Sequence, residues 1–124
     1  KETTRLLVQG GATVIIASRN QDKLLKAKKQ ISDELIANGF SETEERIGVA
    51  QLDVSNEASI KEAFNKVIAK HGRIDILINN AGISGEEKMV VDMSLEGWRK
   101  TLQSNLLSNY ELIQLALPFM KKQK

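Results

Sequence analysis

Three short apolar runs alternate with longer segments in which apolar residues recur every three or four positions. The runs span residues 12–17, 47–52 and 74–78, and the first is rich in β-branched residues. Continuous apolar runs of this length are typical of strands covered on both faces of a parallel sheet. We therefore predict three parallel strands, the second of them weakened by Gly48, since glycine has no side chain to pack.

The remaining segments show helical periodicity. They predict four helices, at residues 1–9, 20–39, 55–72 and 94–118. Ser55 and Ser94 are the expected N-caps of the last two, because a hydroxyl oxygen accepts a free N–H of the first turn. Gly72 should stop the third helix, and Pro118 should kink or end the fourth. Strands that alternate with helices indicate an α/β fold with a parallel sheet.

Composition narrows the class of protein. The 124 residues suffice for one domain, and 41% hydrophobic with 27% charged residues is typical of a soluble globular protein. A net charge of +2, with basic and acidic residues interleaved, does not favour nucleic acid. The absence of cysteine and the single histidine argue against disulfides and a metal site. Without a membrane-length apolar run or a signal peptide, we expect no membrane partner and a cytoplasmic location.

Polar and small residues follow the third apolar run. Asn79 and Asn80 come directly after it, and Ala81 and Gly82 come next. Turn chemistry is one explanation, because asparagine tolerates left-handed backbone and bonds nearby backbone groups. A ligand site is the other, because ligands bind at the carboxyl ends of parallel strands and small residues let a planar ligand approach.

The segment Asp75–Gly82 resembles the Asn-Asn-Ala-Gly motif of the short-chain dehydrogenase/reductase family. Residues 12–20, 52–55 and 71–75 agree with further family motifs, as does Trp98 leading to Asn105, so the resemblance covers essentially the whole chain. It implies a Rossmann-like doubly wound parallel sheet, present here in part. Residues 1–124 would then form a partial NAD(P)-binding Rossmann domain.

Ser18 and Arg19 follow the first predicted strand and bear on the choice of cofactor. In dinucleotide-binding folds an acidic residue at this place bonds the ribose 2′-hydroxyl, whereas a basic one accommodates a 2′-phosphate. The sequence Ser18-Arg19-Asn20 has no acid, so the resemblance implies NADP(H) in preference to NAD(H). The alternative is an exposed loop arginine.

The resemblance implies further cofactor contacts after the second and third strands. Asp53 would accept a bond from the adenine amino group, and the amide of Val54 would meet the adenine ring. Asn80, Ala81 and Gly82 would line the cofactor site. Asp53 has an alternative role at the start of a helix, where an acid is favoured by the helix dipole, and the two roles are compatible.

Asn105 is the one candidate catalytic residue. Asparagine is a poor residue for a helix interior, so its place inside the predicted fourth helix needs a reason. The resemblance implies that Asn105 distorts this helix and holds a water of a proton relay. An exposed polar helix position is the alternative. We interpret Tyr110 as a helix-packing residue, because position 114 is Gln where a catalytic tyrosine would need Lys.

Two family signatures lie outside the sequence. The glycine-rich turn would precede Lys1, and the Ser and Tyr-x-x-x-Lys set would follow Lys124. We therefore expect an internal part of an NADP(H)-dependent oxidoreductase that acts on a small carbonyl or alcohol substrate. The 124 residues alone should be inactive, and the complete enzyme should form a homo-oligomer.

Two other classes of protein remain open. One is a non-catalytic nucleotide-binding or scaffold module. The other is a receiver-type signalling domain, because Asp53 after the second predicted strand mimics a phospho-acceptor. Against the receiver domain, no acidic pair near the N-terminus is present to hold Mg²⁺.

Overall fold

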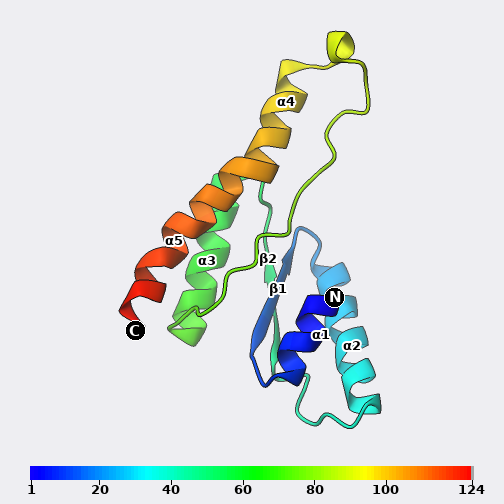
Figure 1. The fold of residues 1–124 in the computed structure, drawn as a ribbon, viewed down its shortest axis with the longest axis vertical. Coiled ribbons are helices and arrows are strands. Elements are labelled where there is room, and N and C mark those ends of the chain that lie inside the picture. Colours follow the sequence, from blue (N-terminus) through cyan, green and yellow to red (C-terminus); the bar gives the residue numbers. More distant parts are fainter. Residues whose placement is uncertain (124) are drawn as a thin grey trace. The chain divides into compact units, whose positions relative to one another are not determined.

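The computed structural model of the protein describes residues 1–123, which form two compact units, Lys1–Leu52 and a second that begins at Asp53 (Figure 1). The first unit contains α1 (Glu2–Gln9), β1 (Val14–Ser18), α2 (Gln21–Ala37) and β2 (Ile47–Gln51). The second contains α3 (Glu57–His71), the 3₁₀ turn η1 (Val90–Asp92), α4 (Leu95–Leu102), the π-helical turn η2 (Gln103–Leu107) and α5 (Ser108–Lys122).

In the first unit β1 and β2 pair in parallel, from Val14 opposite Ile47 to Ser18 opposite Gln51, which confirms two of the three predicted strands. Gly48 lies within this pair, directly opposite Ile15. An added Cβ at Gly48 would lie 2.4 Å from Cδ1 of Ile15, its partner across the ladder. The missing side chain therefore makes room for Ile15.

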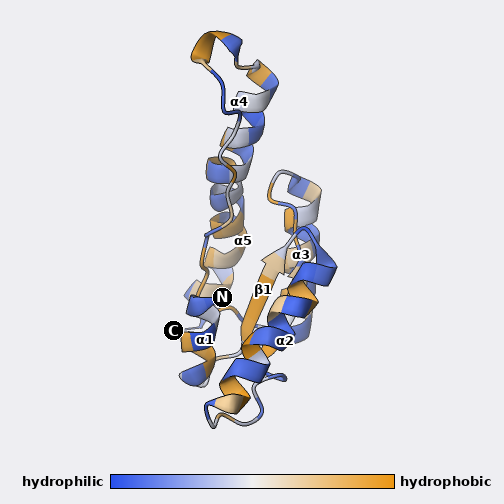
Figure 2. Ribbon diagram, turned by 90° about the vertical axis from the view of Figure 1, so that its right-hand side faces the viewer, coloured by the Kyte–Doolittle hydropathy of each residue, from blue (hydrophilic) through white to orange (hydrophobic). Residues whose placement is uncertain are grey.

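The core of the first unit lies where α1 and α2 meet the strands. Figure 2 shows β1 as hydrophobic. The buried residues of this core are Val8, Ile31, Leu35 and Ile47, and Val14 and Ile16 of β1 pack against them. Leu24, Ile31 and Leu35, which recur at helical spacing within residues 20–39, are therefore on the buried face of α2. This helix begins at Asn20, whose Oδ1 accepts the N–H of Lys23 at 2.9 Å.

In the second unit α3 begins one residue later than predicted. Its N-cap is Asn56, which accepts the N–H of Ser59 at 3.1 Å, and the predicted cap Ser55 is wrong. The hydroxyl and N–H of Ser55 instead donate to Oδ1 of Asp53, at 2.6 and 2.9 Å. The helix ends as predicted at Gly72, whose φ of 69° suits glycine.

The predicted fourth helix is present but interrupted by η2. Ser94 is its N-cap as predicted, accepting the N–H of Gly97 at 2.9 Å. Pro118 does not end it, because α5 continues to Lys122. The aromatic ring of Phe119 lies 5.7 Å from that of Phe64 on α3, so the two helices pack together.

Small residues form the most buried positions of this last helix, namely Ser104, Ser108 and Ala116. The apolar residues that define its periodicity are instead 43–60% exposed: Trp98, Leu102, Leu106, Ile113 and Leu117. Tyr110 is 61% exposed, so its interpretation as a helix-packing residue is wrong.

The predicted third strand, residues 74–78, is also wrong. Among residues 1–123 the sheet contains only β1 and β2, and Ile76 and Ile78 are 61% and 51% exposed. A strand is defined by ladder bonds to a neighbour, and this segment has no neighbouring strand in the second unit.

Two side-chain carboxamides instead hold residues 74–83 at the two ends of the segment. Gln123 accepts the N–H of Ile74 at 3.0 Å and donates to its C=O at 2.8 Å. Asn105 makes the same pair of bonds with Ile83, both at 2.8 Å. The eighteen residue steps from 105 to 123 span about 27 Å at the rise of a helix, and the nine steps from 74 to 83 span about 30 Å in an extended chain. The segment therefore runs extended and antiparallel to the last helix (Figure 1).

Candidate functional site

The carboxyl ends of β1 and β2 place two candidate residues of the first unit. The N–H of Leu52 donates to the C=O of Ser18 at 2.9 Å, and Nε2 of Gln51 donates to the C=O of Arg19 at 3.0 Å. These bonds continue the parallel pairing past the last ladder residues. The backbone of Ser18 and Arg19 is therefore fixed, while both side chains are exposed.

The guanidinium of Arg19 makes no hydrogen bond or ion pair with any residue in the range 1–123. An exposed, fully charged group with five free N–H donors at the end of a parallel strand is suited to a phosphate. The chemistry of this position thus fits the 2′-phosphate of NADP(H), and Arg19 would hold it.

Asp53 and Val54 form a turn at the start of the second unit. The N–H of Asp53 donates to Oγ of Ser59 at 3.0 Å, and its Oδ1 accepts both bonds from Ser55. The turn closes with a bond from the N–H of Asn56 to the C=O of Asp53 at 3.1 Å. Asp53 thus orders the turn that leads into α3, while its favourable interaction with the helix dipole and its contact with adenine stay predictions.

Gly82 and Asn105 come from different sequence motifs and lie together. An added Cβ at Gly82 would lie 3.0 Å from Oδ1 of Asn105, so a larger residue would push the carboxamide away from Ile83. Asn80, Ala81 and Gly82 are exposed, as a surface for a planar ligand requires. The three predicted site residues at the end of the third apolar run are therefore accessible, and one of them, Gly82, lies against Asn105.

The helix around Asn105 is distorted. The N–H of Ser108 donates to the C=O of Gln103, five residues back, which defines a π-helical turn. Side chains bond the carbonyls of this turn: Oγ of Ser108 donates to Ser104 at 2.7 Å, and Nδ2 of Asn109 donates to Asn105 at 3.0 Å. The distortion predicted at Asn105 is present, whereas its role in a proton relay stays a prediction.

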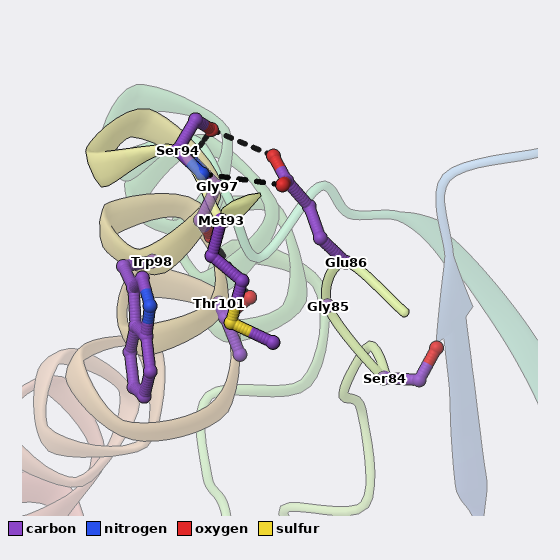
Figure 3. A pocket seen from close by; sticks show the side chains of 8 residues that line it. All are labelled: Ser84, Gly85, Glu86, Met93, Ser94, Gly97, Trp98 and Thr101. Carbon is purple, nitrogen blue, oxygen red and sulfur yellow. Dashed lines mark hydrogen bonds between the residues drawn. The ribbon is translucent and has the colours of Figure 1, made fainter. Parts of the chain in front are cut away.

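A second cluster escaped the sequence analysis. Glu86 accepts the hydroxyl of Ser94 at 2.6 Å and its N–H at 3.2 Å, which places a carboxylate at the N-terminus of α4 (Figure 3). These bonds hold the pKa of Glu86 below its usual value, with a smaller contribution from Lys88. A glycine inside a helix was the signal that could have found this cluster, because Gly97 costs helix stability without a local reason.

Other kinds of site receive no support within residues 1–123. That part of the chain contains no group of three His, Cys, Asp or Glu side chains placed to hold a metal ion. None of its helices combines the length and the apolar character that crossing a membrane requires.

The structure thus combines a parallel α/β unit, an exposed arginine after its first strand and an Asn-Asn-Ala-Gly segment further along the chain. The family model described as short chain dehydrogenase matches residues 1–124. The chain belongs to the short-chain dehydrogenase/reductase family, and its fold is of the Rossmann type found in its structural neighbours.

Individual relatives agree with this assignment. The 3-oxoacyl-(acyl-carrier-protein) reductase of Thermotoga maritima is 35% identical over 127 residues, covering 100% of this chain and 46% of that protein. The NAD(+) 15-hydroxyprostaglandin dehydrogenase of Rattus norvegicus is 31% identical over 123 residues, covering 99% and 40%. The C-domain of a bacterial malonyl-CoA reductase, solved with NADP, matches with a TM-score of 0.89 and 42% identity, covering 98% and 19%. The chain thus spans less than half the length of each.

Proposed function

We propose that this chain is part of an NADP(H)-dependent oxidoreductase that transfers hydride between the nicotinamide and a small carbonyl or alcohol substrate. The observation that carries the proposal is the exposed guanidinium of Arg19, fixed at the end of β1 without a protein partner among residues 1–123. Its charge offsets that of a 2′-phosphate. The malonyl-CoA reductase domain that resembles the chain was solved with NADP, which supports this preference, although the similar rat enzyme uses NAD(+).

The other candidate residues have defined roles in this proposal. The nicotinamide supplies or accepts the hydride. Asp53 and Val54 hold the adenine of the cofactor. A planar ring of the cofactor approaches the backbone at Asn80, Ala81 and Gly82. Asn105 holds a water in the path of the proton that accompanies the hydride.

The proposal extends to the complete protein. We expect it to be a cytoplasmic homo-oligomer, and we expect the 124 residues alone to bind cofactor poorly and to catalyse no turnover. In the complete enzyme, backbone N–H groups of a glycine-rich turn would hold the pyrophosphate.

Charge reversal at Arg19 tests the choice of cofactor. In the complete enzyme, Arg19→Asp should weaken NADPH binding by about 10- to 100-fold, the worth of one charge-assisted contact, and leave NADH binding within about twofold. The measurement is the dissociation constant of each cofactor by titration. Lys26→Asp, on the exposed face of α2, is the matched control. It makes the same change in net charge away from Arg19, so it should weaken the binding of NADPH and NADH only slightly, through long-range repulsion of the cofactor. Equal losses for both cofactors, or none, would make Arg19 an ordinary loop residue.

A further inference from the structure

The loop that follows Gly82 closely approaches the last helix at three helix positions spaced four residues apart, namely 105, 101 and 97. Asn105 bonds the backbone of Ile83, and an added Cβ at Gly85 would lie 2.9 Å from Oγ1 of Thr101. An added Cβ at Gly97 would lie 2.4 Å from Oε1 of Glu86. Residues four apart lie on one face of a helix, so the loop follows a single helix face for more than two turns.

Glu86 makes the attachment furthest from Asn105. Its Oε1 accepts the hydroxyl of Ser94 at 2.6 Å, and its Oε2 accepts the N–H of the same residue at 3.2 Å. The hydroxyl oxygen of Ser94 in turn accepts the N–H of Gly97 at 2.9 Å. Lys88 lies 3.4 Å from Oε2. Figure 3 shows the carboxylate directed at the first turn of α4, where it bridges the loop and the helix.

The contact with Glu86 accounts for the glycine at position 97. Its backbone is not left-handed, so alanine could adopt the same conformation. Glycine inside a helix is less favourable than alanine by about 0.5–1 kcal/mol. The three atoms nearest to an added methyl group all belong to the side chain of Glu86, at 2.4–3.0 Å. The glycine therefore serves to admit the carboxylate.

We propose that Glu86 is a positioning residue, which holds the loop on α4 so that Gly82 and Ile83 keep one conformation beside Asn105. The inference rests on the proposed function, since Gly82 belongs to the predicted cofactor site and Asn105 to the predicted relay. Glu86 itself touches neither; it acts through the loop. Without the bonds of Glu86, the nearest hydrogen bonds between this loop and the helix, among the described residues, are those of Ile83 with Asn105.

Amide hydrogen exchange tests the mechanical part of the proposal and needs no catalytic activity. In Glu86→Ala the amide of Ile83, which is bonded to Asn105, should exchange about tenfold faster, because local opening of the loop exposes it. Gly97→Ala should have the same effect, although alanine stabilises the helix itself. Glu86→Gln should retain protection, because its carboxamide can accept the N–H of Ser94 and donate to the hydroxyl oxygen. Unchanged exchange at Ile83 in the two alanine variants would overturn the proposal.

Kinetics of the complete enzyme test the link to the reaction. Glu86→Ala and Gly97→Ala should each lower kcat by about tenfold, since small misplacements of reacting groups are costly, with the KM for NADPH little changed. The double variant should lose no more than either single variant, because both remove the same contact. Glu86→Gln should restore most of kcat. If the contact were merely structural, its loss would lower the melting temperature but would not lower kcat while leaving the KM for NADPH unchanged.

The outcomes separate this inference from the proposed function. Wild-type protein without NADPH-dependent turnover would contradict the proposed function, and the exchange at Ile83 would then decide on Glu86 alone. Normal turnover in wild type with undiminished kcat in both alanine variants would overturn the positioning role and leave the proposed function standing.

Discussion

β1 and residues 74–83, which begin with the third apolar run, are both extended, but they satisfy their backbone groups in different ways. β1 lies in a parallel ladder with β2, and its apolar side chains pack on α1 and α2. Residues 74–83 are held at their two ends by the carboxamides of Gln123 and Asn105, and Ile76 and Ile78 between these ends are largely exposed. An apolar run thus specifies extended backbone, whereas burial requires a partner on each side.

Truncation of one buried and one exposed side chain should show the largest difference between the two units. Leu35 is fully buried in the first unit, so Leu35→Ala should destabilise that unit by about 2–5 kcal/mol. Ile76→Ala in the second unit should cost about 0.5 kcal/mol or less, because Ile76 is 61% exposed. Urea unfolding followed by amide exchange in each unit measures both effects. A comparable cost for Ile76→Ala would place residues 74–78 in a packed core.

Local patterns predicted most of the fold, because helix periodicity and capping are properties of neighbouring residues. The buried face of α2, the cap at Ser94 and the stop at Gly72 all agree with the structure. The strand at residues 74–78 failed for the opposite reason: ladder bonds depend on residues far apart in the chain.

The features of the candidate site also differ in whether a local sequence pattern could identify them. Arg19 and Asn105 stand out locally, one as a basic residue after a strand and the other as a polar residue in a helix. The bond from Asn105 to Ile83 spans 22 positions, and that from Gln123 to Ile74 spans 49. No local pattern encodes such pairs. Glu86 was equally hidden, because a carboxylate that caps a helix from eight residues upstream of Ser94 has no fixed sequence signature.

Asn105→Leu should have the next largest effect. In the complete enzyme kcat should fall by about 100-fold, the lower end of what a positioned proton-transfer group contributes, with the KM for the cofactor little changed. The variant also loses two bonds to the backbone of Ile83, so a lower melting temperature is expected despite the better helix propensity of leucine. Both kcat and the melting temperature should be measured on one preparation.

Gln123→Leu is the matched control for this variant. It removes the same pair of carboxamide bonds, to Ile74 at the other end of the segment, far along the helix from the predicted relay. The two variants should therefore lose similar stability, about 1–3 kcal/mol for two hydrogen bonds, but only Asn105→Leu should lose turnover. Equal losses of kcat would mean that the effect of Asn105 comes from its pair of bonds to the loop backbone, and not from a relay water.

The smallest expected effect is the dependence of the Glu86 contact on pH. Hydrogen bonds from the hydroxyl and then the N–H of Ser94, with the nearby charge of Lys88, lower the pKa of Glu86 from its ordinary value of 4.5. A lowered pKa in the folded state means that the stabilisation is complete above pH 4.5 and is lost as the pH falls through the lower, folded value. Glu86→Gln keeps the geometry without the charge, so wild type should melt at a higher temperature than this variant at about pH 7, and the difference should vanish once the pH lies below the lowered pKa of Glu86. Other groups that titrate in this range are common to both proteins and cancel in the difference. A difference in melting temperature that stays constant across this range would show that the carboxylate charge contributes nothing to the contact.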